Sequence, residues 1–254
     1  MCLLAIAWQV HPDYPLVVCA NRDEFYARPA QVAHFWPDHP QLFGGRDLQQ
    51  GGSWMGISRK GRFSAITNIR DPQANRADAS SRGLLVSRFL QGEGTALDYC
   101  ETLQSQGQIY NGYNLIAYDG CSLVYQSNYT AQPQCLAPGL YGVSNSTLDI
   151  AWPKAQSAVQ KLGRWLEQPG TIDQLALLLN DRSIVADQRL PQTGVPLALE
   201  RVLSAEFIEH EEYGTRCSTA LLVHRSGLAE YCEVTHHPAP SLTQQRIEDF
   251  LPAF

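Results

Sequence analysis

The chain has 254 residues, with 19 lysines and arginines against 25 aspartates and glutamates, so its formal net charge is −6. The hydrophobic fraction of 44% and the charged fraction of 17% are typical of a globular protein and exclude an intrinsically disordered one. The negative net charge argues against a protein that binds nucleic acid. No apolar run reaches the roughly 20 residues that an integral membrane segment needs.

The apolar N-terminal segment, residues 1–8, lacks a positively charged region before it and is followed directly by polar residues. It therefore predicts a buried first strand and not a signal peptide. The cysteines are odd in number, widely spaced and free of any C-x-x-C pair: Cys2, Cys19, Cys100, Cys121, Cys135, Cys217 and Cys232. This usage favours reduced thiols over a disulfide framework or a zinc site and predicts a cytoplasmic protein.

Four hairpins are predicted along the chain from apolar runs that flank turn residues. The first turn carries Pro12 and Pro15, the second Gly61, the third the pair Asp119-Gly120, and the fourth Gly227. The expected strand pairs are 3–9 with 16–20, 53–58 with 62–68, 113–118 with 121–126, and 219–224 with 228–235.

Helices are expected between these hairpins. Leu85 and Phe89 begin one, and Thr95 opens the next with a capping-box pattern. Pro153 begins a helix with apolar residues at helical spacing, and a second capping box at 171–174 leads into Leu175, Leu178 and Leu179. The predicted order is strands, helices, strands, helices, strands and a final helix, which is not strict βαβ alternation. It predicts an α+β sandwich with antiparallel sheets packed between helices, formed as a single domain over residues 1–254.

Cys2 is the first candidate for chemistry. Removal of Met1 would leave a cysteine whose free α-amino group, with a pKa of about 8, can accept the proton of its own thiol. The alternative is a small apolar residue at the start of a strand.

A polar run, Asn21-Arg22-Asp23-Glu24, ends the second predicted strand. It is either a solvated turn or a set of charges that holds a thiolate or amine. Strand alternation places Arg22 on the opposite side from Asn21 and Asp23.

Three further polar residues lie at predicted strand ends or turns: Asn68, Asn145 and Arg216. They are either structural or supply oxyanion donors and an anion clamp. Residues 44–47 and 51–53 bracket a glycine-rich loop, which is either a flexible lid beside the site or a plain surface turn.

Several of these features occur together in one family. The 21–24 run with Cys2 at the start, together with residues 25–29, 51–56, 65–68, 110–115 and 213–216, resembles the NRDE family, the homologues of transport and Golgi organization protein 2. The resemblance implies a fold like that of the N-terminal-nucleophile (Ntn) hydrolases, which is a four-layer αββα sandwich.

A more distant resemblance links the chain to Ntn amidases of the cholylglycine hydrolase type. It implies that Cys2 is the nucleophile, that Asn68 binds the oxyanion, and that Asp23, Asn145 and Arg216 complete the catalytic set. The chain departs from that pattern at one point. It has Ala20 where those amidases have an arginine, and Arg22 stands two positions later.

Two functions follow from these resemblances. The NRDE resemblance implies intracellular haem trafficking, in which a small hydrophobic ligand, haem or an acyl-type lipid, binds in the Cys2 cleft against Asn21, Arg22 and Glu24. The alternative is an amidohydrolase that cleaves a non-peptide C–N bond with Cys2. The displaced arginine favours the carrier. Neither function requires a cofactor or a metal site, and haem enters only as a bound ligand.

Overall fold

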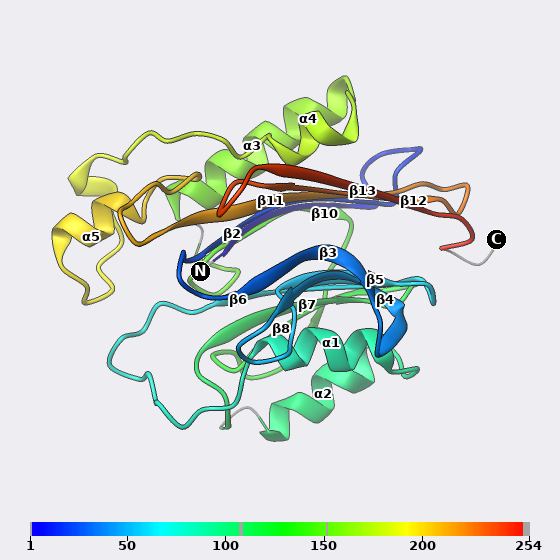
Figure 1. Ribbon diagram of the computed structural model, residues 1–254, viewed down its shortest axis with the longest axis horizontal. Helices are drawn as coiled ribbons and strands as arrows, with labels where there is room; N and C mark the ends of the chain where they lie inside the picture. Colours follow the sequence, from blue (N-terminus) through cyan, green and yellow to red (C-terminus); the bar gives the residue numbers. More distant parts are fainter. Residues whose placement is uncertain (1, 107–108, 151, 251–254) are drawn as a thin grey trace.

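The computed structural model describes residues 2–106, 109–150 and 152–250 of the chain. Two antiparallel sheets lie face to face, and helices cover the outer face of each sheet (Figure 1). The predicted fold class, an α+β sandwich of four αββα layers, is therefore confirmed. No helix among the described residues is long and apolar enough to cross a membrane.

The first sheet has the strand order β10-β1-β2-β11-β12-β13. Its strands are β1 (Cys2–Trp8), β2 (Leu16–Phe25), β10 (Gly139–Val143), β11 (Tyr213–Val223), β12 (Ala229–Thr235) and β13 (Ser241–Ile247). The second sheet runs from β3 to β9 in chain order. Its strands are β3 (Ala30–Trp36), β4 (His39–Asp47), β5 (Met55–Ser58), β6 (Arg62–Asn68), β7 (Tyr113–Tyr118), β8 (Leu123–Ser127) and β9 (Gln134–Cys135).

The helices form the two outer layers. The second sheet is covered by α1 (Gly83–Gln91) and α2 (Ala96–Gln106), and the first by α3 (Pro153–Glu167) and α4 (Ile172–Ala176) (Figure 1). A short helix, α5 (Leu197–Val202), precedes β11 in the chain. The predicted capping box is present at α4, where the Thr171 N–H donates to Gln174 Oε1 at 3.1 Å.

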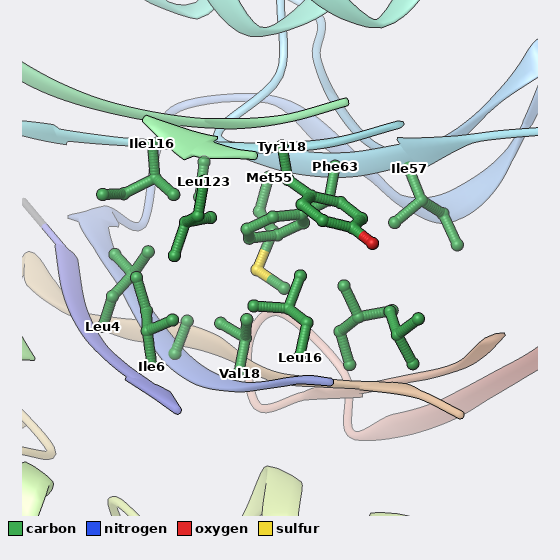
Figure 2. Close-up of a cluster of buried hydrophobic side chains, with 14 of the residues drawn as sticks. Leu4, Ile6, Leu16, Val18, Met55, Ile57, Phe63, Ile116, Tyr118 and Leu123 are labelled. Carbon is green, nitrogen blue, oxygen red and sulfur yellow. The ribbon is translucent and has the colours of Figure 1, made fainter. Parts of the chain in front are cut away.

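The main core lies between the two sheets. Leu4, Ile6, Leu16 and Val18 project from the first sheet toward side chains of the second, among them Met55, Ile57, Phe63, Ile116, Tyr118 and Leu123 (Figure 2). Alternate residues of β1, such as Leu3 and Ala5, point the other way and pack under α3 and α4. Because both faces of β1 are buried, the strand is almost continuously apolar.

All four predicted hairpins are present, the predicted surface turn is confirmed, and two other expectations are wrong. Residues 44–47 belong to β4, and residues 48–50 form the exposed turn that follows it. The second strand does not end at Ala20: β2 continues to Phe25 because β11 pairs with it along this whole stretch. The last regular element that the structure describes is the strand β13 and not a helix, because it pairs with β12 along its length.

Candidate active site at Cys2

A cavity of ≈ 230 Å³ lies beside Cys2. The ends of β1, β2 and β6 form one part of its wall, and the segments 47–54 and 76–83 form the rest. Of the eight residues that the sequence analysis singled out, the cavity brings together five: Cys2, Arg22, Asp23, Glu24 and Asn68. The other three, Asn21, Asn145 and Arg216, do not line it.

Cys2 is placed in this cavity by the pairing of β1 with β2. It lies opposite Arg22 in the register, so both side chains leave the sheet on the same side, toward the second sheet. Burial raises the pKa of the Cys2 thiol above its ordinary value of 9.0, while Arg22 and the backbone N–H of Asp23 lower it. The thiol is therefore mostly protonated at neutral pH.

Arg22 lies on the opposite side of β2 from Asn21, as predicted, but this is the side that faces the cavity. It is the residue that shares the cavity with Cys2, whereas Asn21 faces the helices. The Arg22 side chain is only 6% exposed, and its guanidinium carbon lies 4.1 Å from the centre of the Trp54 ring. No hydrogen bond joins the Arg22 guanidinium to another group in the part of the chain that the structure describes, so its donors are available to a ligand.

Asn21 is held entirely by protein groups. Its Nδ2 donates to the carbonyl oxygens of Leu179 at 2.7 Å and Glu206 at 2.9 Å, and its Oδ1 accepts from Ser218 Oγ at 2.6 Å. These bonds join β2 to β11 and to the segments that follow α4 and α5. Asn21 therefore has a structural role.

Asp23 is buried beneath the cavity, where its Oδ1 accepts a hydrogen bond from Thr215 Oγ1 at 2.8 Å. Burial raises the pKa of its carboxyl, and the positive charge of Lys154 opposes the shift. Lys154 itself is 3% exposed and donates to the Leu203 carbonyl at 3.0 Å. Burial lowers the pKa of Lys154 to about 8, against the pull of Asp23 and Cys2. Two buried ionisable groups, the Lys154 amine and the Asp23 carboxyl, thus interact electrostatically with the Cys2 thiol.

Asn68 and Asn145 differ in their position relative to the cavity. Asn68 ends β6 and lines the cavity. Asn145 lies behind it: its Nδ2 donates to the Asn68 carbonyl at 2.9 Å, and its own carbonyl accepts from the Arg70 N–H at 2.8 Å. Asn145 therefore fixes the end of β6, and the Asn68 side chain is the one in a position to meet a ligand.

Arg216 does not reach the Cys2 cavity. Its Nη1 donates to the carbonyl oxygens of Phe25 and Arg28, both at 2.9 Å, and its Nε donates to the His237 carbonyl at 3.3 Å. These bonds hold the turn after β2. A β-bulge between Thr215 and Cys217 on β11 gives Arg216 this direction.

The wall of the cavity is strongly charged. Arg28 pairs with Asp47, with Nη2 and Oδ2 2.6 Å apart, and lies 3.8 Å from Glu24. Arg82 donates to the Gly112 carbonyl at 3.0 Å, and burial lowers the pKa of its guanidinium. Sequence reasoning missed Arg82 and Lys154, because each lies at a helix start where a basic residue is ordinarily solvated. Lys154 itself was the available signal, because the first turn of a helix favours acidic residues and a lysine there is unusual.

No group of three or more histidine, cysteine, aspartate or glutamate side chains within the described ranges is arranged to hold a metal ion. His236 and His237 do not act together, because His236 Nε2 lies 2.9 Å from Ser218 Oγ while the His237 ring stacks on Tyr26.

Comparison with known proteins agrees with this architecture. The sequence profile of the family described as Transport and Golgi organisation 2 matches residues 1–238. The chain is 36% identical to the Transport and Golgi organization protein 2 homolog of Bos taurus and 26% identical to Transport and Golgi organization protein 2 of Drosophila melanogaster. Each match covers 92% of both chains.

Two solved structures share the fold at low sequence identity. One is an N-acylethanolamine-hydrolyzing acid amidase ortholog of Caenorhabditis elegans, at a TM-score of 0.50 and 11% identity over 87% of this chain and 92% of that one. The other is a mutant of the conjugated bile acid hydrolase of Clostridium perfringens, at a TM-score of 0.50 and 8% identity over 96% of this chain and 92% of that one. At these identities the likeness concerns the fold alone.

Proposed function

This chain belongs to the Transport and Golgi organisation 2 family and has an Ntn-hydrolase-like fold, and from that premise we propose that it is an amidohydrolase with Cys2 as its N-terminal nucleophile. The observation that carries the proposal is that Cys2, Asp23 and Asn68 line one cavity. The names of the two structural neighbours, an amidase and a bile acid hydrolase, support the same class of reaction. The bond cleaved is a non-peptide C–N bond.

The proposed reaction has two steps. Cys2 Sγ attacks the carbonyl carbon of the amide, the C–N bond breaks, and the thiol proton passes to the departing nitrogen. Water then attacks the resulting thioester, which releases a carboxylic acid and restores the thiol. The Asn68 side-chain amide is proposed to donate a hydrogen bond to the oxyanion of each step.

The reaction needs a base, because burial keeps the Cys2 thiol protonated at neutral pH. We assign this role to the α-amino group of Cys2 after removal of Met1, a residue that lies outside those that the structure describes. An α-amino group has a pKa of about 8, close to the working pH that general-base catalysis favours. Asp23 is the carboxyl proposed to orient this amine. The seven free thiols support a cytoplasmic location.

The test combines intact-mass measurement with an assay for released amine. Mass spectrometry of the protein from its own source is expected to show loss of Met1. A panel of small N-acyl amides is then assayed by fluorescamine, with Cys2→Ala expected to lose all activity. Cys121→Ala, which removes an exposed thiol, is the matched control and retains activity. Retention of Met1, or turnover that survives Cys2→Ala, contradicts the proposal.

A second candidate is the carriage of haem or an acyl-type lipid, favoured by one observation: Arg22 is buried in the cavity without a carboxylate partner among the described residues. A haem propionate would supply one. The hydrolase is preferred because the cavity is small and charged. Its ≈ 230 Å³ is less than the about 300–1,000 Å³ of ordinary ligand pockets, which suits a small amide better than a large hydrophobic ligand such as haem.

Titration of haem, followed by its absorbance, tests this second candidate. Arg22→Gln is expected to weaken binding at least tenfold, and Lys60→Gln to leave it unchanged. Equal binding by both variants rejects this site for haem.

A further inference from the structure

A second pocket, of ≈ 40 Å³, lies beyond Arg22 as seen from Cys2. The strand register places Cys2, Arg22, Cys217 and Thr235 side by side across β1, β2, β11 and β12. Arg22 and Trp54 line both the Cys2 cavity and this pocket. The stacked Arg22–Trp54 pair is therefore the wall between the two spaces.

Polar atoms without partners gather around this pocket. Glu233 Oε2, Thr235 Oγ1, Trp54 Nε1 and His237 Nδ1 are all buried and make no hydrogen bond to any described residue. All four belong to residues that line the pocket. Folded proteins leave very few buried polar atoms unsatisfied, and each one signals a missing partner. Four such atoms around one space indicate that a polar group occupies it.

The size and chemistry of the pocket restrict that group. A water molecule needs about 10–15 Å³ on this measure, so ≈ 40 Å³ holds about three water-sized atoms. The Trp54 indole N–H and the Arg22 guanidinium donate hydrogen bonds. Glu233 Oε2 accepts one, and the Thr235 hydroxyl does either. The occupant must therefore offer both an acceptor and a donor within three heavy atoms.

We propose that this pocket is a subsite for an uncharged carboxamide group, whose oxygen accepts from Trp54 Nε1 and Arg22 and whose N–H donates to Glu233 Oε2 and Thr235 Oγ1. A carboxamide has three heavy atoms and both kinds of hydrogen-bonding group. The carboxamide group binds on the far side of the Arg22–Trp54 wall from Cys2, so this subsite is separate from the Cys2 cavity.

Charged occupants fit less well. At pH 8, where Glu233 is ionised, a carboxylate has no N–H for Glu233 Oε2 and meets the negative charge of that side chain. An ammonium group has no acceptor for the Trp54 indole and lies beside the cationic Arg22 and Arg216, which also lines the pocket.

Titration with acetamide, followed through the ¹⁵N-indole signal of Trp54, tests the subsite without any substrate. Trp54→Phe identifies the signal by its loss. At pH 8, above the pKa of about 7 that burial gives Glu233, acetamide is expected to shift it saturably in the folded protein, and acetate is not. Thr235→Val, which removes only the hydroxyl, and Glu233→Gln, which keeps an acceptor for the Ala33 N–H, are expected to raise the dissociation constant at least tenfold. Thr102→Val, on the exposed face of α2, is the matched control and leaves it unchanged.

Three results overturn the proposal: a shift that never saturates, a saturable shift that is equal with acetate, or acetamide binding that survives both variants. Thermal melts of each variant confirm that it is folded before its titration counts. The same titration on Cys2→Ala separates the two proposals. Acetamide binding in that variant supports the subsite even if the protein proves to have no amidohydrolase activity, and loss of binding in a folded Cys2→Ala counts against it.

Discussion

At the scale of single residues, strand register decides which polar side chains meet. Cys2 lies opposite Arg22, so these two share the cavity, while Asn21 points to the other face of the sheet. The same polar run therefore supplies one residue to the candidate site and another to the packing of the helices. Two predictions follow from this division, one for the thiol and one for Asn21.

The first prediction concerns the reactivity of Cys2. Iodoacetamide reacts with the thiolate form of a cysteine, and burial raises the pKa of the Cys2 thiol above 9.0. The alkylation rate of Cys2 is therefore expected to rise about tenfold per pH unit from pH 7 to 9. Peptide mapping by mass spectrometry measures it, with the exposed Cys121 of the same molecule as an internal reference. A rate that levels off below pH 8 would show a thiolate already formed and contradict this account.

The second prediction separates structure from ligand binding at Asn21. Asn21→Ala removes three buried hydrogen bonds and is expected to lower the free energy of unfolding by about 2–3 kcal/mol. Urea denaturation measures the loss. The exposed Asn180→Ala is the control and changes stability little. The Cys2 alkylation rate stays within about twofold of the parent protein, because Asn21 does not line the cavity. A tenfold change in that rate would restore a ligand-binding role to Asn21.

At the scale of elements, two loops close the cavity by direct backbone contact. Gly52, in the segment between β4 and β5, lies against Gly83 at the start of α1, and the Ser53 N–H donates to the Gly83 carbonyl at 3.1 Å. A Cβ added at Gly52 would lie 2.3 Å from the Gly83 carbonyl carbon. Only glycine permits this approach, so the contact fixes the wall that holds Ser53, Arg82 and Gly83.

The third prediction tests that contact. Gly52→Ala is expected to push the two segments apart and to cost about 1–3 kcal/mol of stability, as other overpacking substitutions do. It also changes the Cys2 alkylation rate, since the cavity wall moves. Gly94→Ala is the matched control, because a Cβ there meets nothing within 4 Å. Stability and reactivity that are equal in the two variants would show that this contact does not shape the cavity.

At the scale of the whole molecule, a buried carboxyl joins the two sheets. Glu233 on β12 is 1% exposed, and its Oε1 accepts from the Ala33 N–H of β3 at 2.7 Å. Burial raises the pKa of this carboxyl to about 7, against the hydrogen bond from Ala33 and the charge of Arg22. The folded protein thus holds a proton at Glu233 that the unfolded chain releases at a lower pH.

The fourth prediction follows from this linkage. Between pH 4.5 and about 7 the folded state binds more protons at Glu233 than the unfolded state, so its contribution to the free energy of unfolding falls as the pH rises. The full effect above pH 7 is at most about 3 kcal/mol. Glu233→Gln is therefore expected to match the parent protein near pH 4.5 and to exceed its stability at pH 8. Urea denaturation across this range measures the difference, with the exposed Glu209→Gln as control. A pH-independent difference would contradict the assignment.

Local patterns in the sequence were enough for much of the secondary structure. The four hairpins and the starts of α2, α3 and α4 follow from turn and capping residues, whose effect is confined to a few neighbours in the chain. The family motif correctly indicated the sandwich fold. Of the eight site residues that it suggested, the structure brings five to one cavity: Cys2, Arg22, Asp23, Glu24 and Asn68. These are features that neighbouring residues or a recognisable motif determine.

Tertiary structure alone decided the rest. The length of β2 and the strand β13 depend on pairing with β11 and β12, partners that local periodicity does not identify. Asn21 and Arg216 have structural roles because their side chains donate hydrogen bonds to carbonyl groups from distant segments of the chain. The burial of Lys154 and Glu233 likewise arises only when the layers close over them. The sequence specified the candidate chemistry at Cys2, and strand register with burial decided which side chains surround it and in which charge state.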